Sequence, residues 1–248
     1  MSETWMEEAA ERLWRAAGGV PSFPRNMESL VSFALPLDVI RLPKLTVRAA
    51  EDWIVQRRGV CHLLCQNRAL CGCVVALRGI GVVFLDADDP SDERRFTLAH
   101  EIAHFLLDYL FQREAALHAF GPTIRPVLDG DRPPTTTERL HALLADVPLG
   151  LFINLMEREA DGRIVRGPIW NAENRADILA IHLLAPFEAV RAHLSIVPKE
   201  TERLAFEQDV ETVLQNVFGL PSVIAQDYTR WLWQRLHRPS SRDWLGLS

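Results

Sequence analysis

Residues 94–108, RRFTLAHEIAHFLLD, predict the helix around which this chain of 248 residues is organised. Two histidines stand four positions apart, so on an α-helix they differ by about 40° around the axis and about 6 Å along it. His100 and His104 can therefore direct ring nitrogens at one metal ion. Glu101 lies roughly 100° further round the helix, where its carboxylate can reach a water at that ion and act as a general base. The spacing predicts a metal site with its own base.

A catalytic zinc ion ordinarily takes three protein ligands, so the site needs one more carboxylate or imidazole. Asp108 stands about 12 Å along a continuous helix from His100, which is too far for a shared ion. Glu173 is better placed, because it opens a predicted helix whose small residues allow close approach to the histidine helix. The rival candidates for the third ligand are His118, Glu157, Glu159 and Asp161.

A further carboxylate, Asp177, follows Glu173 by one helical turn. It is placed to accept a hydrogen bond from the remote ring nitrogen of His100 or His104, which would fix the tautomer of that ring. The alternative interpretation of Glu173 and Asp177 is a solvated helix start, where carboxylates favour the helix dipole.

Composition and charge limit the classes of protein. Hydrophobic residues make up 48% of the chain, enough for a substantial core, and the formal net charge is −6. The basic residues are scattered, so we expect neither nucleic-acid nor membrane-surface binding. Residues 1–8 lack the pattern of a secretory signal, and no apolar run approaches the ~18 residues of a membrane span. We expect a cytoplasmic protein, and the oligomeric state stays open.

Four cysteines, Cys61, Cys65, Cys71 and Cys73, lie close together but do not have the spacing of a zinc knuckle. Cys71 and Cys73 alternate within a predicted strand and so face the same side of it. Reduced cysteines packed as small apolar side chains are favoured over a second metal cluster.

Hydrophobic periodicity predicts a mostly helical chain with a small sheet. Strands are expected at about 39–42, 68–77 and 80–86, the last two forming a hairpin that leads to the histidine helix. Asn171 is the expected N-cap of the helix that carries Glu173. The expected helices cover about 3–17, 26–34, 46–56, 90–107, a stretch from 136 or 137, 172–184, 186–194, 200–217 and 222–237.

Two blocks of this sequence resemble the ImmA/IrrE family of metallopeptidases, which look like gluzincins of the thermolysin type. Residues 95–107, RFTLAHEIAHFLL, are similar to the family's Arg-Phe-Thr-Leu-Ala-His-Glu segment. The second block, from Glu173 to Pro186, has the pattern ExxADxxAxxLLxP. The resemblance covers about 68–108 and 170–232, and it implies an α+β, mostly helical, zincin-like fold with a small β-sheet packed beside the helix of the HExxH motif.

By that resemblance, His100, His104 and Glu173 are the metal ligands, Glu101 is the base and Asp177 is the orienting carboxylate. It implies a zinc endopeptidase, although manganese and iron also suit such ligands. The implied substrate is a protein, in known members a helix-turn-helix transcriptional repressor, often in stress responses. Residues proposed to stabilise the oxyanion are Tyr109, Arg175 and Tyr228.

Three other functions compete with the endopeptidase. In the first, the chain is a non-catalytic or latent metal-binding regulator that binds a partner protein, with residues 112–169 covering the site. DNA binding through 199–248 is disfavoured, because acidic residues interrupt its arginines. A hydrolase similar to peptide deformylase would use Cys61 as a ligand, but the cysteine motif of that family is absent.

The expected domain organisation follows from the two blocks. Residues 1–198 form the metallopeptidase domain, in which 1–58 is an N-terminal helical part. The 68 residues between His104 and Glu173 exceed what many family members have, so 112–169 is expected to be an insertion. Residues 199–248 form a C-terminal helical region.

Overall fold

The computed structural model describes residues 4–58, 66–144, 147–157, 170–194 and 203–237. The chain divides into two units, one made of residues 1–21 and 26–183 and the other of residues 22–25 and 184–248. The expected boundary between residues 198 and 199 lies outside the described residues. The first unit carries both blocks of the sequence that predict a metal site.

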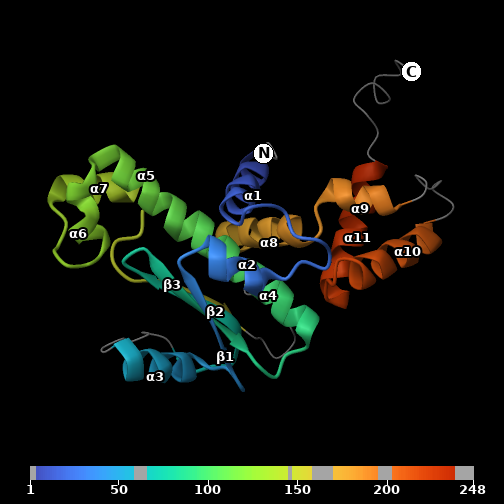
Figure 1. Ribbon diagram of the computed structural model, residues 1–248, viewed down its shortest axis with the longest axis horizontal. Helices are drawn as coiled ribbons and strands as arrows, with labels where there is room; N and C mark the ends of the chain where they lie inside the picture. Colours follow the sequence, from blue (N-terminus) through green and yellow to red (C-terminus); the bar gives the residue numbers. More distant parts are fainter. Residues whose placement is uncertain (1–3, 59–65, 145–146, 158–169, 195–202, 238–248) are drawn as a thin grey trace, which may run out of the picture. The chain divides into compact units, whose positions relative to one another are not determined.

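A mixed four-stranded sheet lies in the first unit (Figure 1). Its strands are β1 (Leu37–Leu42), β2 (Leu70–Leu77), β3 (Ile80–Asp86) and β4 (Phe152–Glu157), in the order β1-β3-β2-β4. The predicted hairpin is confirmed, since β2 and β3 pair antiparallel, and β1 joins β3 in parallel. The sequence analysis missed β4, which pairs antiparallel with β2 and forms an edge of the sheet.

The helix that carries the histidines is longer than predicted. It begins as α4 (Ser91–His104), continues through a π-helical turn, η1 (Phe105–Leu110), and runs on as α5 (Phe111–Phe120). The expected end near residue 107 is therefore wrong. The helix ends at Gly121, whose φ of 71° is a left-handed conformation that glycine adopts without strain.

Two short helices, at residues 122–124 and 125–128, were not predicted, and the other remaining helices agree closely with the hydrophobic periodicity. One expectation is wrong: α8 begins at Trp170, so Asn171 lies inside the helix and is not its N-cap. The first unit also contains α1 (Thr4–Ala16), α2 (Met27–Ala34), α3 (Val47–Arg58), η2 (Pro122–Ile124), α6 (Arg125–Leu128), α7 (Thr136–Leu144) and α8 (Trp170–Leu184, as far as Leu183). The second unit contains α9 (Phe187–His193), α10 (Arg203–Asn216) and α11 (Ser222–Leu236).

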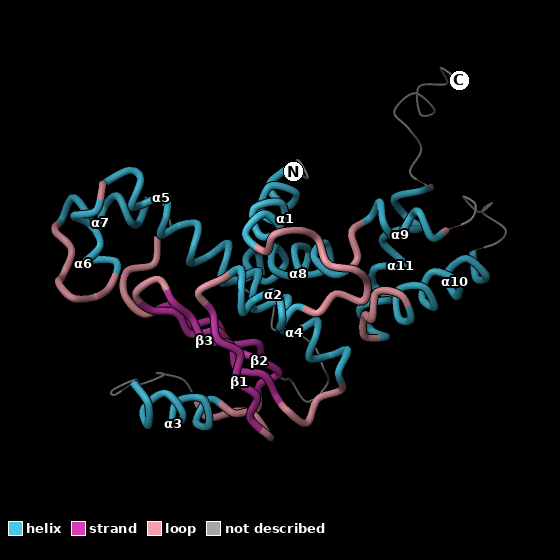
Figure 2. The backbone as a smooth tube through the Cα atoms, viewed as in Figure 1, coloured by secondary structure: helices cyan, strands magenta, loops and turns pink. Residues whose placement is uncertain are grey.

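The two faces of the sheet are covered by different helices, α3 on one face and α4 with η1 on the other (Figures 1 and 2). The α3 face is apolar, because alternate strand residues such as Cys73 and Phe84 pack against Ala50 and Ile54. The side chains of this cluster are Leu45, Val47, Ala50, Ile54, Leu70, Cys73, Val75, Val82 and Phe84.

Glycines on the opposite face let α4 approach the strands closely. A Cβ atom at Gly72 would lie 2.5 Å from Cγ2 of Thr97 and 3.4 Å from Cγ of Glu101. A Cβ atom at Gly81 would lie 2.8 Å from the ring of Phe105. Side chains at these two positions would therefore push the helix away from the sheet, and with it the carboxylate of the HExxH motif.

Apart from β4, which joins the sheet, the described part of the expected insertion forms a small helical layer. Around α5 and α6, Ala116, Ile124, Val127 and Leu128 form a separate apolar cluster with Val147. A buried ion pair also ties this layer together, between Arg113 on α5 and Asp129 after α6.

In the second unit, α10 and α11 pack through aromatic side chains. The ring centroids of Phe206 and Trp233 are 5.5 Å apart, and Phe23 meets Phe218 edge-on at 4.5 Å. Across both units, none of the described helices is long and apolar enough to cross a membrane.

Candidate metal centre

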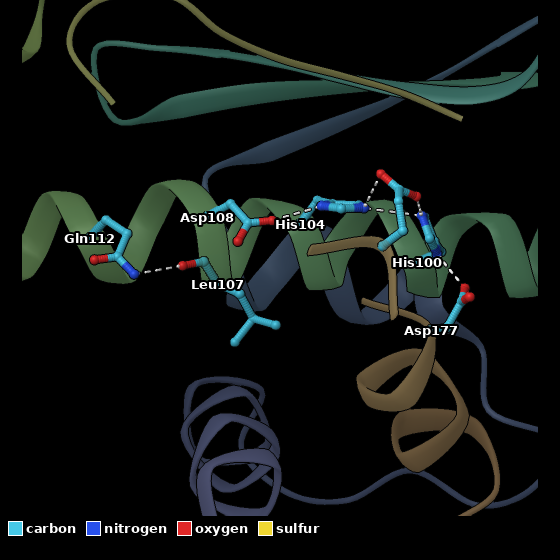
Figure 3. Close-up of polar contacts among 7 residues, drawn as sticks. His100, His104, Leu107, Asp108, Gln112 and Asp177 are labelled. Carbon is cyan, nitrogen blue, oxygen red and sulfur yellow. Dashed lines mark hydrogen bonds and ion pairs between the residues drawn. The ribbon is translucent and has the colours of Figure 1, made fainter. Parts of the chain in front are cut away.

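The three polar side chains of the HExxH motif are almost completely buried. The exposed fraction is 0% for His100 and Glu101 and 1% for His104. Both histidines project from the same side of α4, one turn apart, and Figure 3 shows their rings next to each other. Their Nε2 atoms are 3.1 Å apart, as the spacing argument requires.

The third member of the group is Glu173, from the first turn of α8. Its Oε2 atom is 3.2 Å from Nε2 of His100, and its Oε1 atom is 3.4 Å from Nε2 of His104. Among the His, Cys, Asp and Glu side chains of the described ranges, these three form a group that could hold a metal ion. Their ligand atoms lie within 4.8 Å of one another. Among the described residues, the structure therefore brings Glu173 to the histidines.

Each histidine is held from behind by its own aspartate. Nδ1 of His100 is 2.8 Å from Oδ1 of Asp177, and Nδ1 of His104 is 2.7 Å from Oδ2 of Asp108. Figure 3 shows that Asp177 reaches His100 from α8, whereas Asp108 reaches His104 from the helix that carries His104 itself. A carboxylate that accepts a hydrogen bond from Nδ1–H leaves the Nε2 lone pair free for a metal ion.

The contact of Asp108 was missed in the sequence analysis, which considered this residue only as a direct ligand. The signal was present, because residues four apart on a helix are neighbours. Asp108 lies in the π-helical turn that directly follows His104, and π-turns within α-helices occur frequently at functional sites.

The charges around the histidines favour protonated rings in the absence of metal. Burial lowers the pKa of His100, but hydrogen bonds with Asp177 and Glu173 outweigh it and raise the pKa to about 10. The pKa of His104 is also raised: burial lowers it, and the contacts with Asp108 and Glu173 more than offset that effect. For Glu173, burial raises the pKa, but the two histidines lower it to about 2. The site therefore holds positive charge beside a Glu173 carboxylate.

Glu101 is in a different environment from Glu173. Both of its carboxylate oxygens are buried and lack a hydrogen-bond partner among the described residues. Burial raises its pKa to about 7, although both histidines act to lower it. A buried carboxylate without partners is costly in a protein interior, so this group indicates a site built for a water or an ion.

The donor set fits a divalent transition metal. Two imidazoles and one carboxylate are the three protein ligands typical of catalytic zinc. Donor atoms at zinc distances and tetrahedral angles are separated by about 3.3 Å, and the separations of 3.1, 3.2 and 3.4 Å found here agree with that value. The unpartnered oxygens of Glu101 lie next to this set on α4.

The rival residues are not brought to the histidines by the described structure. His118 is exposed near the end of α5 and is not in the ligand group. Glu157 ends β4, and its side chain is not described, while Glu159 and Asp161 lie outside the described residues. Cys61 and Cys65 also lie outside them. Cys73 is fully buried and reduced, and burial raises its thiol pKa well above the usual value.

The three residues proposed to stabilise the oxyanion differ in their surroundings. Tyr109 is buried, and its phenolic oxygen accepts a hydrogen bond from the backbone N–H of Gly79 at 2.7 Å. Tyr228 belongs to the second unit, where it donates to the backbone oxygen of Ala185 at 3.0 Å. Arg175 lines the same cleft as His104 and Glu173. Of the three, only Arg175 lines this cleft in the described structure.

The cleft beside the ligand group has a volume of about 500 Å³. His104, Asp108 and Glu173 lie on its wall, and Asn154 of the edge strand β4 contributes an amide. Nδ2 of Asn154 is buried and lacks a hydrogen-bond partner within the described ranges. Its other lining residues are Gln112, Arg139, Ala142, Val147, Pro148, Leu149, Phe152, Ala172 and Arg175.

Comparison with known proteins agrees with this geometry. Residues 66–123 match the Peptidase_M78 family model, described as the IrrE N-terminal-like domain. The matched segment contains β2, β3 and the whole histidine helix, and it supports an ImmA/IrrE family metallopeptidase. The resemblance inferred from the sequence and the α+β zincin-like fold are thereby confirmed. No curated protein matches the chain significantly.

Proposed function

We propose that this protein is a metal-dependent endopeptidase, with zinc as the metal and a protein as the substrate. The observation that carries the proposal is the convergence of His100, His104 and Glu173 beside the buried, unpartnered carboxylate of Glu101. The match to a peptidase family over residues 66–123 supports the same reaction class.

His100, His104 and Glu173 would hold the ion, and Asp177 and Asp108 would keep the two imidazole rings in the orientation that binding needs. When bound, a divalent ion supplies the Lewis acidity that makes water nucleophilic near neutral pH. The residues that hold the ion come from α4 and α8, two elements far apart in the sequence. Binding would therefore connect the two sequence blocks, around His100 and around Glu173, into one site.

Glu101 would perform the proton transfers. Its carboxylate takes a proton from the attacking water and passes it to the amine nitrogen that leaves as the peptide bond breaks. A general base is most effective when its pKa is near the working pH, and burial brings the pKa of Glu101 to about 7.

The biological substrate follows only from the family resemblance. We propose a cytoplasmic role in which the protein cleaves a helix-turn-helix transcriptional repressor, as in a stress response. The α4–β4 side of the cleft fits a polypeptide, because among the described residues β4 pairs on one side only and an extended chain could add to its other side.

Cleavage of a peptide library by the zinc-loaded protein tests the function, with products identified by mass spectrometry. We expect cleavage that a chelator abolishes and zinc restores. Glu101→Gln should retain the metal and lose activity by about 10²- to 10⁴-fold. Full activity in a metal-loaded Glu101→Gln protein would contradict the mechanism. A zinc-loaded wild type that binds but never cleaves would favour the non-catalytic regulator.

A further inference from the structure

Within the described residues, two arginines of the cleft have no carboxylate partner once the metal centre is assigned. Arg139 from α7 and Arg175 from α8 both line the cleft beside His104. The two carboxylates in the same wall are already engaged, Asp108 with His104 and Glu173 with both histidines. Within the described part of the chain, neither arginine forms an ion pair with a carboxylate.

This lack of pairing contrasts with the rest of the first unit. The buried Arg113 pairs with Asp129, Arg132 with Glu138, and Arg78 with Asp131. The helical layer that carries Arg139 thus neutralises Arg113 and Arg132 internally. The chain as a whole is acidic, with a formal net charge of −6. Two unpaired guanidinium groups in one cleft are therefore a local excess of positive charge.

The walls around the arginines are mostly apolar. Val147, Leu149 and Phe152 line the cleft together with Ala142, Pro148 and Ala172. A charged group beside apolar walls is poorly screened, which strengthens its attraction for an opposite charge. Arg175 is also partly buried, and its guanidinium carbon lies 5.5 Å from the ring centroid of Trp5 on α1. This cation–π contact and the partial burial restrict the positions that the guanidinium group can adopt.

We infer that the cleft binds a carboxylate of the substrate through Arg139 and Arg175, and that these residues make the enzyme prefer an Asp or Glu side chain close to the scissile bond. The planar guanidinium group forms paired hydrogen bonds with a carboxylate, which a neutral amide cannot reproduce. This inference rests on the proposed function, because it names the substrate chemistry of the same cleft.

Binding and cleavage can be measured separately. Three acetylated, amidated peptide libraries would be identical except for Glu, Gln or Lys at one fixed position. Binding is measured by fluorescence anisotropy on zinc-loaded Glu101→Gln protein, and cleavage on the wild type. We expect the Glu library to bind and to be cleaved about 10- to 100-fold better than the Gln library, the range for a hydrogen-bonded charge. A fourth library, neutral and with a free C-terminus, tests whether a terminal carboxylate serves instead.

Charge-reversal variants test the two arginines. In Arg139→Glu and Arg175→Glu the ratio of kcat/KM for Glu over Gln peptides should fall towards one, and Lys peptides should gain. The matched control is Arg48→Glu, an exposed position on α3 at the other face of the sheet, which should keep the wild-type ratio.

Equal binding of Glu and Gln peptides would overturn the inference, as would a preference for Glu that both arginine variants retain. A preference only for the free C-terminus would overturn the side-chain assignment and keep the arginines as carboxylate ligands. If the wild type cleaved no peptide but the protein still bound Glu peptides better than Gln peptides, the endopeptidase function would be contradicted. The binding of an acidic side chain in the cleft would still be supported.

Discussion

The two faces of the central sheet are built in opposite ways. The α3 face is closed by a cluster of apolar side chains, with Phe84 fully buried and the aromatic ring of Trp53 packed against it at 5.4 Å. The α4 face buries His100, Glu101 and His104, and it needs glycines at Gly72 and Gly81 to admit the helix. The same two central strands, β2 and β3, therefore support a hydrophobic core on one side and a candidate metal centre on the other.

The difference shows where this fold accepts a cost in stability. Burial of apolar surface on the α3 face stabilises the protein by roughly 25 cal/mol per Å². On the α4 face, buried ionisable groups oppose folding unless hydrogen bonds or a metal ion compensate them. We therefore expect substitutions on the α3 face to change stability alone, and substitutions on the α4 face to change metal binding as well.

The largest expected loss of stability is on the apolar face. Phe84→Ala removes a fully buried ring and should lower the free energy of unfolding by about 3–5 kcal/mol. Chemical denaturation measures this, and the zinc content of the folded protein should not change. The matched control is Phe33→Ala on α2, whose side chain is 86% exposed and should contribute less than about 0.5 kcal/mol. A loss of zinc from folded Phe84→Ala protein would break the separation of the two faces.

A smaller loss is expected from Gly72→Ala, because the added methyl group would lie 2.5 Å from Thr97. Overpacking of this kind typically costs about 1–3 kcal/mol. Unlike Phe84→Ala, this variant should also reduce peptidase activity, since Glu101 lies in the same contact. If the free energy of unfolding and the peptidase activity were both unchanged, the position of α4 would not depend on close contact with β2.

The two aspartates behind the histidines should affect metal affinity rather than folding. Asp177→Asn and Asp108→Asn should each weaken zinc binding about 10- to 100-fold, the usual effect of losing such support. Competition with a chromogenic chelator measures the affinity. Asp52→Asn, an exposed position on α3, is the control and should bind zinc as the wild type does. If Asp108→Asn matched this control, the contact of 2.7 Å with His104 would have no role in binding.

The smallest expected effect is the pH dependence of zinc binding, which reports the release of a proton from His100. The pKa of His100 is raised from 6.5 to about 10 in the metal-free protein, so this ring is protonated at pH 8 and stabilises the fold. That contribution is complete below pH 6.5 and is lost as the pH rises towards 10. Zinc must displace the proton, so its affinity should rise about tenfold per pH unit in this window. Calorimetry in buffers of different ionisation enthalpy should detect the released proton, and its absence would contradict the charge balance of the α4 face.

Local spacing was sufficient for the part of the site that lies on one helix. The interval of four residues predicted that His100 and His104 face one point, and their Nε2 atoms lie 3.1 Å apart. Glu173 and Asp177 come from another helix, and only the pattern of the second block indicated them over rivals such as Glu159. Asp108 was missed because its contact with His104 requires the helix to continue past residue 107, where the helix was expected to end.

Elements with a strong hydrophobic pattern could be predicted from the sequence. Elements whose conformation depends on pairing with a distant strand could not. The hairpin of β2 and β3 has continuous apolar runs, and the structure confirms it. Strand β4 has six residues with mixed polarity, and its conformation depends on pairing with β2. The extension of the histidine helix to Phe120 depends on a π-helical turn, for which no composition rule exists.

The central claim is that α4 and α8 together hold one metal ion. Its most direct test is the metal content of gently purified protein by mass spectrometry, for the wild type, Glu173→Ala and Glu159→Ala. We expect close to one zinc ion per chain in the wild type and in Glu159→Ala, and little in Glu173→Ala. Zinc lost only from Glu159→Ala, or absent from the wild type even after zinc is supplied, would contradict the metal centre described above.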